Sequence, residues 1–218
     1  MFGRGRHRRK RGGRAVEDVE LTENEVVDEG PLTGPFDESQ ARDDGVGRLD
    51  LGCMRLPLPD GAQLQVEVDP SGPVRAVHLL TELGQLTVTA FAAPRDGQLW
   101  TEVRAEITDQ LRADGARVEQ VFDGEWGREV QAVTPQVSLR FVGVDGPRWM
   151  LRGVAAGVPE QHPRLVELLY QVLRDTVVVR GAEPMPPRSP LPITLPGPMA
   201  EQLKLAAAQQ GQQPPPTG

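Results

Sequence analysis

Residues 148–180 read RWMLRGVAAGVPEQHPRLVELLYQVLRDTVVVR, and this stretch of the chain decides the fold. From Trp149 to Ala155 the side chains alternate between a largely apolar set and a mixed set, which is the period-two pattern of a β-strand. Pro159 and Pro163 then bracket a turn. Proline suits the first position of a helix, because the missing N–H would have no partner there. The stretch therefore predicts a strand that leads through a turn into a helix.

The helix predicted after this turn has an apolar stripe that would face a core, with polar residues opposite it. At helical spacing the stripe contains Leu165, Leu168, Leu169, Val172 and Leu173. The β-branched run from Thr176 to Val179 then favours a last strand, and its valines indicate burial on both sides. A strand, a helix and a strand in this order require a sheet with the helix on one face. The rest of that sheet must therefore come from earlier in the chain.

Earlier segments supply the other strands and one more helix. After an irregular extended piece, strand patterns with turns between them occur at 64–68, 74–81, 86–93, 117–122, 128–133 and 137–144. Apolar residues from Trp100 to Leu111 recur at helical spacing, with Asp96 as the expected N-cap and Gly115 as the expected C-terminal residue. We therefore predict an α+β domain, in which helices pack on the faces of a mostly antiparallel sheet.

Composition sets the limits of this domain. The chain has 218 residues, of which 38% are hydrophobic, and its mean hydropathy of -0.38 is low for one compact unit. Apolar residues concentrate between about residues 49 and 180, which predicts one domain at 46–181. A domain of this size can bury a core without disulfides or a bound metal. We expect a disordered tail, basic and then acidic, at 1–45 and a tail rich in proline and glutamine at 182–218.

Cys53 is the single cysteine of the chain. One cysteine excludes an intramolecular disulfide and a zinc site built on cysteines, and it suits a reducing compartment. No apolar run approaches the roughly 18 residues that a membrane helix needs, and no apolar stretch follows the basic N-terminus as it would in a secretory signal. We therefore expect a cytoplasmic protein without a membrane span.

Charge is divided sharply near the N-terminus. Residues 1–14 carry six arginines and one lysine, a charge of +7, whereas residues 17–44 carry eleven acids and one arginine, a charge of -10. The basic tip indicates either an anionic partner, such as RNA, DNA, a ribosome or acidic lipid, or a solvated tail that folds back on its acidic neighbour. Its charged residues are Arg4, Arg6, Arg8, Arg9, Lys10, Arg11 and Arg14. Near the other end, residues 191–195 either dock on the domain or belong to a stiff free tail.

No set of residues converges on catalysis, on a cofactor or on a metal. The histidines are His7, His78 and His162. They fall in different segments, and none has a second ligand at metal-binding spacing. Glu125 and Glu129 flank Trp126 and form either an acid/base pair or the charged rim of a hairpin. We therefore predict that the protein is not an enzyme and that it carries neither a cofactor nor a metal.

Trp126 stands beside glycines in a predicted turn, where an aromatic side chain can be exposed. Together with Arg128, Arg148 and Arg152 it predicts an aromatic–guanidinium patch for a partner protein, because aromatic and arginine side chains dominate the energetics of protein interfaces. In the alternative, Trp126 packs down as a lid on the sheet.

Two phrases, FDGEWGREV at 122–130 and DGPRWMLRGVAAG at 145–157, resemble an actinobacterial domain-of-unknown-function family, numbered thirty-seven ten. The basic and then acidic start of the chain is similar in character, and the resemblance spans roughly residues 46–180. It implies an actinobacterial cytoplasmic protein and brings no catalytic residues with it. The order of the predicted elements also resembles the Mog1/PsbP-like sandwich, a likeness of topology that does not give a function.

These observations favour a non-enzymatic protein-interaction module as the function. Two alternatives stay open. The protein could associate with nucleic acid through its basic tip, or it could bind a small ligand in a pocket between the sheet and a helix.

Overall fold

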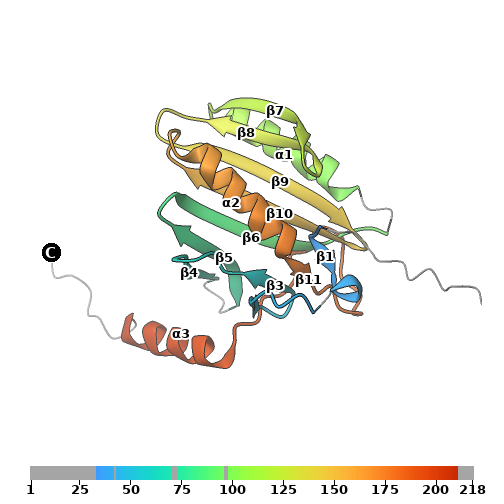
Figure 1. Ribbon diagram of the computed structural model, residues 1–218, viewed down its shortest axis with the longest axis vertical. Helices are drawn as coiled ribbons and strands as arrows, with labels where there is room; N and C mark the ends of the chain where they lie inside the picture. The colour runs from blue at the N-terminus through green and yellow to red at the C-terminus, as the bar shows by residue number, and fades with distance from the viewer. Residues whose placement is uncertain (1–32, 42, 70–72, 96–97, 211–218) are drawn as a thin grey trace, which may run out of the picture.

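The computed structural model describes residues 33–41, 43–69, 73–95 and 98–210, and its largest element is a seven-stranded antiparallel sheet (Figure 1). The strands follow the order β4-β5-β6-β10-β9-β8-β7 across the sheet. Their bounds are Gln63–Val68 (β4), Val74–Thr81 (β5), Gly84–Ala92 (β6), Arg117–Gly124 (β7), Gly127–Val133 (β8), Ser138–Gly146 (β9) and Trp149–Gly157 (β10). Two meanders, β4 to β6 and β7 to β10, meet where β10 pairs with β6. Strand β10, the first strand predicted in residues 148–180, therefore joins the two halves of the sheet.

A second, smaller sheet contains short strands from both ends of the domain. Its order is β1-β11-β3-β2, and the bounds are Phe36–Asp37 (β1), Arg48–Asp50 (β2), Met54–Pro57 (β3) and Val177–Val178 (β11). The two valines of β11 are buried as predicted, but they pair with β1 and β3 and not with the large sheet. A run of valines predicts burial, and burial does not specify which strands become the partners.

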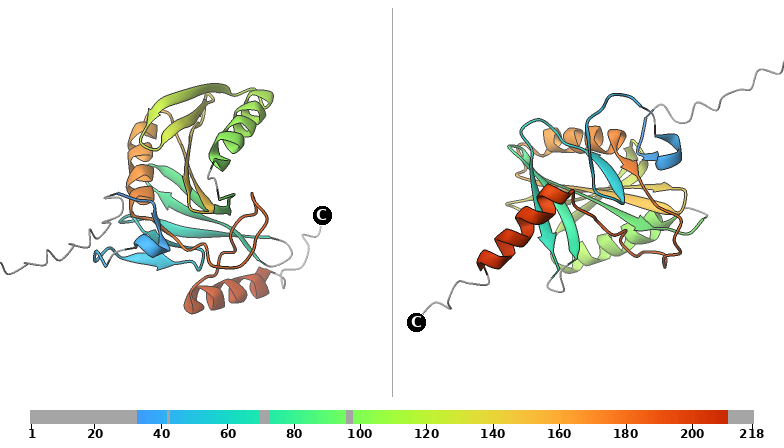
Figure 2. Two further views of the ribbon diagram at one scale, coloured as in Figure 1. Left: turned by 90° about the vertical axis from the view of Figure 1, so that its right-hand side faces the viewer. Right: turned by 90° about the horizontal axis from the view of Figure 1, so that it is seen from below.

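Helices cover both faces of the large sheet (Figure 2). The helical bounds are Leu99–Ala113 (α1), His162–Asp175 (α2), Gly197–Gln210 (α3) and, for a 3-10 turn, Glu38–Gln40 (η1). Helix α1 packs on β7, β8 and β9, whereas α2 lies mainly on β10 and also contacts β6, β9 and β3. The predicted α+β architecture is confirmed. Asp96, the expected cap of α1, lies outside the described residues. Within the described ranges, none of the helices has the length and apolar character to cross a membrane.

The alternation in β10 decides which side chains meet which helix. Leu151 is fully buried in the cluster that contains Leu169 of α2. Its neighbour Met150 points to the other face and joins the cluster that contains Trp100 of α1. Gly153 lies beneath α2, where an added Cβ would stand 2.9 Å from Leu169 Cδ1. The absence of a side chain at this position lets α2 approach the sheet closely.

Residues on both sides of the 46–181 span also contact the domain. The amide of Gly34 donates to the carbonyl oxygen of Arg174 at 3.0 Å, at the end of α2. Beyond β11, Leu191 is only 4% exposed, and its amide donates to the carbonyl oxygen of Ala90 in β6 at 2.8 Å. Of the two possibilities for this segment, docking on the domain is the one that the structure shows.

Candidate functional site

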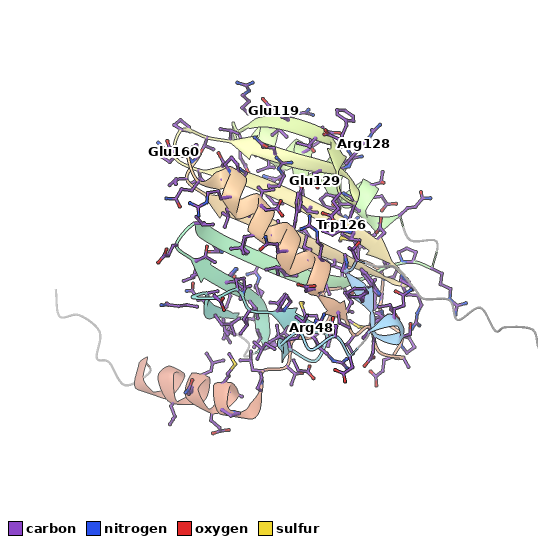
Figure 3. All side chains as sticks on the ribbon, in the orientation of Figure 1. Arg48, Glu119, Trp126, Arg128, Glu129 and Glu160 are labelled. Atoms are coloured by element: carbon purple, nitrogen blue, oxygen red, sulfur yellow. The ribbon has the colours of Figure 1, made fainter. Side chains whose placement is uncertain are left out.

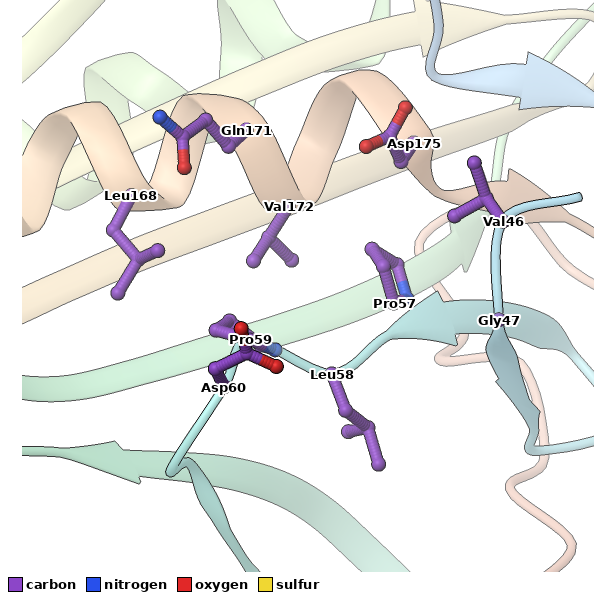
Figure 4. A pocket seen from close by; sticks show the side chains of 10 residues that line it. All are labelled: Val46, Gly47, Pro57, Leu58, Pro59, Asp60, Leu168, Gln171, Val172 and Asp175. Atoms are coloured by element: carbon purple, nitrogen blue, oxygen red, sulfur yellow. The ribbon is translucent and has the colours of Figure 1, made fainter. Parts of the chain in front are cut away.

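A groove with a volume of about 340 Å³ lies between α2 and the segment that carries β2 and β3 (Figure 4). One side is lined by four residues from successive turns of the helix: Leu168, Gln171, Val172 and Asp175. The other side consists of Val46, Gly47, Pro57, Leu58, Pro59 and Asp60. In Figure 4 the side chains of Leu168 and Val172 point from the helix toward the two prolines. The groove is therefore formed by residues more than 100 positions apart in the chain.

The lining of the groove combines exposed apolar side chains with negative charge. Val46 is 38% exposed and Leu58 is 44% exposed, so that both belong to the large hydrophobic side chains that face solvent. The ionisable residues of the lining, Asp60 and Asp175, are both acidic. An apolar depression with carboxylates at its rim can accept a partner that offers an apolar side chain next to positive charge.

Arg48 holds the β2 side of the groove against the helix (Figure 3). Its Nε donates to the carbonyl oxygen of Asp175 at 2.5 Å, where α2 ends and leaves carbonyl groups without helical partners. The other two nitrogens of its guanidinium donate to the carboxylate of Asp44 at 2.8 and 2.7 Å. This arginine therefore ties the segment before β2 to the C-terminus of α2 and fixes the width of the groove at that end.

A buried polar cluster lies at the opposite flank of α2, around Glu129 of β8 (Figure 3). Glu129 is 1% exposed, and the hydroxyl of Tyr170 in α2 donates to both of its oxygens at 2.9 Å. Arg140 of β9 donates to Glu129 Oε2 at 3.0 Å and to Gln131 Oε1 at 2.7 Å. Burial raises the pKa of Glu129, while the hydrogen bond from Tyr170 and the charge of Arg140 oppose this. Gly124 leaves room for the cluster, because a Cβ there would stand 2.2 Å from Glu129 Oε1.

Trp126 covers this cluster from the β7–β8 turn. Its ring meets that of Tyr170 edge to face, with centroids 5.7 Å apart, and its Nε1 donates to the carbonyl oxygen of Gly34 at 3.1 Å. At the rim, Arg174 and Glu125 form an ion pair at 2.6 Å. The sequence allowed a charged rim for Glu125 and Glu129 together. Glu125 does lie at the rim, whereas Glu129 is in the interior and is tied to a tyrosine and an arginine.

The structure does not bring the four residues of the predicted aromatic–guanidinium patch together. Trp126 is on the face that carries α2, through its contact with Tyr170. Arg152 is on the other face, where its guanidinium lies 5.0 Å from the ring centroid of Phe91. The sheet itself therefore separates Trp126 from Arg152.

The two remaining members of that patch have different neighbours. Arg128 is exposed and places its guanidinium 4.9 Å from the ring centroid of Phe122 in the neighbouring strand. Arg148 lies in the β9–β10 turn and donates to the carbonyl oxygen of Gly181 at 3.2 Å. Each of the three arginines therefore contacts a different partner: Phe122 for Arg128, Gly181 for Arg148 and Phe91 for Arg152.

The other residues that the sequence singled out have ordinary structural surroundings or lie outside the described residues. Residues 1–14, with the basic tip and His7, are outside them. His78 lies 2.8 Å from Thr87 Oγ1, and His162 is buried at the start of α2. Cys53 is buried, and desolvation raises the pKa of its thiol to about 12, which keeps it protonated and unreactive. Across the described segments there is no group of three or more metal-ligating side chains.

An antiparallel sheet with a helix on each face, a small companion sheet and a groove beside one helix define an α+β sandwich protein. The chain belongs to the family described as protein of unknown function (DUF3710), whose model matches residues 34–202. This confirms the family that the sequence phrases indicated.

The comparison with solved structures gives a likeness in fold. The solution structure of cyanobacterial PsbP (CyanoP) from Synechocystis sp. PCC 6803 is 12% identical, with a TM-score of 0.39. The match covers 63% of this chain and 96% of that chain. A search of the curated proteins gives no match.

Proposed function

We propose that the protein is a non-enzymatic interaction module and that the groove beside α2 is its docking surface. The partner is a protein segment that presents an apolar side chain flanked by lysine or arginine. The observation that supports this proposal is the meeting of exposed Val46 and Leu58 with the carboxylates of Asp60 and Asp175 in one depression.

Two physical arguments connect this groove to such a partner. An apolar anchor that enters a desolvated pocket supplies most of the affinity in a typical protein interface, and a volume of about 340 Å³ is enough for one or two side chains. Charges at the rim contribute mainly to the rate of association and to the choice of partner. Because the rim is acidic, it attracts a basic segment and repels nucleic acid. Association with nucleic acid, the alternative, is therefore a proposal for the basic tip alone.

Peptides selected on the full-length protein from a random display library test the proposal. We expect the selected sequences to place lysine or arginine beside an aliphatic or aromatic residue. Their affinity should fall at least tenfold, which corresponds to about 1.4 kcal/mol, in the double variant Val46→Ser with Leu58→Ser. The replacement of Asp60 by asparagine should weaken binding about twofold to fivefold and should reduce its dependence on salt.

Matched variants control for the effect of the substitutions themselves. Val137→Ser with Val158→Ser removes two similarly exposed apolar side chains elsewhere, and Asp123→Asn removes a carboxylate from an exposed strand position. Both control variants should bind the selected peptides like the parent protein. Peptides with acidic flanks, or peptides that bind the groove variant as tightly as the parent, would contradict the proposal.

A further inference from the structure

The β9–β10 turn holds an arginine in a backbone conformation that favours glycine. Arg148 has a φ of 62°, in the left-handed region that side chains with a Cβ rarely adopt. It follows Pro147, and a proline followed by a residue of positive φ is the arrangement of a type II turn, where glycine is preferred at the second position. The turn would form more easily with glycine, so the side chain of Arg148 is present at some expense to the stability of the turn.

Arg148 and Arg180 both line a pocket with a volume of about 480 Å³. Arg148 Nη2 donates to the carbonyl oxygen of Gly181 at 3.2 Å. Arg180 Nε donates in turn to the carbonyl oxygen of Arg148 at 3.2 Å, and its Nη1 donates to the carbonyl oxygen of Glu183 at 3.1 Å. Backbone carbonyl groups thus hold both side chains in place, and among the described residues no hydrogen bond engages Arg148 Nε, Arg148 Nη1 or Arg180 Nη2.

The acidic residues of the same pocket are engaged elsewhere. The carboxylate of Asp37 accepts hydrogen bonds from the amide and hydroxyl of Ser39 and from Trp149 Nε1 at 2.9 Å. Glu38 forms an ion pair with Arg55 at 3.0 Å. Among the described residues, no carboxylate lies within ion-pair distance of Arg148 or Arg180.

Asp37 is an acidic residue of the same pocket and feels the charge of Arg148. Although partial burial favours its neutral form, the hydrogen bonds from Ser39 and Trp149 and the charge of Arg148 lower its pKa. It is therefore ionised at neutral pH. Its oxygens already accept three hydrogen bonds, from the amide and hydroxyl of Ser39 and from Trp149, and among the described residues it forms no ion pair with either arginine.

We propose that this pocket binds an oxyanion, a carboxylate or a phosphate group, through the guanidinium groups of Arg148 and Arg180. Planar guanidinium groups donate parallel hydrogen bonds to the two oxygens of a carboxylate or phosphate, and two of them at one pocket suit a ligand with more than one negative charge. The volume of the pocket is that of a site for a small molecule. The ligand is thus a small polyanionic metabolite or the anionic end of a larger molecule. The groove beside α2 has no part in this site.

Calorimetric titration of the full-length protein with citrate and with pyrophosphate tests this site. We expect at least one of the two probes to bind, and the stronger one identifies the ligand chemistry as carboxylate or phosphate. Arg148→Gly should weaken that binding at least tenfold while the melting temperature of the free protein stays the same or rises, because glycine suits the turn. Arg148→Asn, which also tolerates positive φ and carries no charge, should lose the same affinity.

The variant Arg75→Ala serves as the control, because it removes an exposed arginine on β5 and should leave binding unchanged. The opposed changes in affinity and melting temperature separate a ligand site from a structural role, for which both would fall together. Failure of both probes to bind, or equal binding by the parent and by Arg148→Gly, would overturn the proposal.

Discussion

Replacing Arg140 with methionine is expected to lower the free energy of unfolding by about 3–5 kcal/mol at pH 8, and by clearly less at pH 5. The ion pair between Arg140 and Glu129 is 3.0 Å long and nearly excluded from solvent, with Glu129 1% exposed. The variant leaves Glu129 as a buried carboxylate that only the hydroxyl of Tyr170 stabilises. A buried charge without a counter-ion is among the most destabilising single changes.

The pH dependence of this loss follows from the pKa of Glu129. Burial raises the pKa above the ordinary value of 4.5. The favourable contribution of the protonated form is therefore present below about pH 4.5 and is lost as the pH rises through the folded-state pKa. Removing Arg140 raises the pKa of Glu129 further, so in the variant the stability continues to fall up to a higher pH than in the parent. His162 acts in the same direction. Burial lowers its pKa, and the charge of Arg140 adds a smaller lowering, so the parent loses stability when this histidine is protonated at acidic pH. The variant lacks the charge of Arg140 and therefore loses less stability on acidification.

Urea unfolding between pH 5 and pH 8 measures the effect. Arg117→Met is the matched control, because it removes an exposed ion pair with Glu119 on β7 and should change the stability by less than about 0.5 kcal/mol. Addition of Glu129→Leu to Arg140→Met should recover a large part of the lost stability, since the pair is then replaced by apolar groups. A loss that is equal at pH 5 and pH 8 would show that Glu129 does not carry the effect.

The periodic elements were the predictable part of the fold. Strand β10 and helix α2 follow directly from the alternation after Arg148 and from the leucine stripe, because periods of 2.0 and 3.6 are local properties of the chain. The partners of β11 were not predictable, because three valines in a row indicate burial and nothing more. The alternation in β10 predicted which of its side chains face the core, but it did not predict which residues of β6 and β9 pair with them.

The sites depended on contacts that no local pattern encodes. The sequence placed Glu129 with Glu125 at a charged rim, since both flank a turn. Glu129 is instead buried against Tyr170, which stands 41 residues away in the chain, so no local pattern reveals the contact. The sequence signal was present but weak: Glu129 occupies an inward position in the alternation of β8, where Gln131 also bonds to Arg140. The groove beside α2 had even less signal, since its two sides come from opposite ends of the domain.

The replacement of Gly143 by alanine is expected to lower the free energy of unfolding by about 3 kcal/mol or more and to detach α1 from the sheet. Gly143 in β9 lies directly beneath the buried ring of Trp100, and an added Cβ would stand 2.0 Å from Cδ2 and 2.2 Å from Cε3. The ring cannot move away freely, because Trp100 Nε1 donates to the carbonyl oxygen of Arg128 at 2.8 Å and its amide donates to Asp145 at 3.1 Å. Displacement of the ring breaks the bond of Nε1, and a shift of the helix to make room breaks the bond of the amide and opens the contact between α1 and β9.

Urea unfolding at pH 7, together with the near-ultraviolet circular dichroism of the tryptophans, measures this effect. Gly197→Ala is the control with the same chemical change, because nothing lies within 4 Å of a Cβ at that position, and it should stay within about 0.5 kcal/mol of the parent. If the clash with the ring is the cause, then Trp100→Leu combined with Gly143→Ala should be less destabilising than the sum of the two single changes, because leucine leaves room for the methyl group. Strict additivity of the two changes would place the damage in the backbone of β9 and not in the packing of α1.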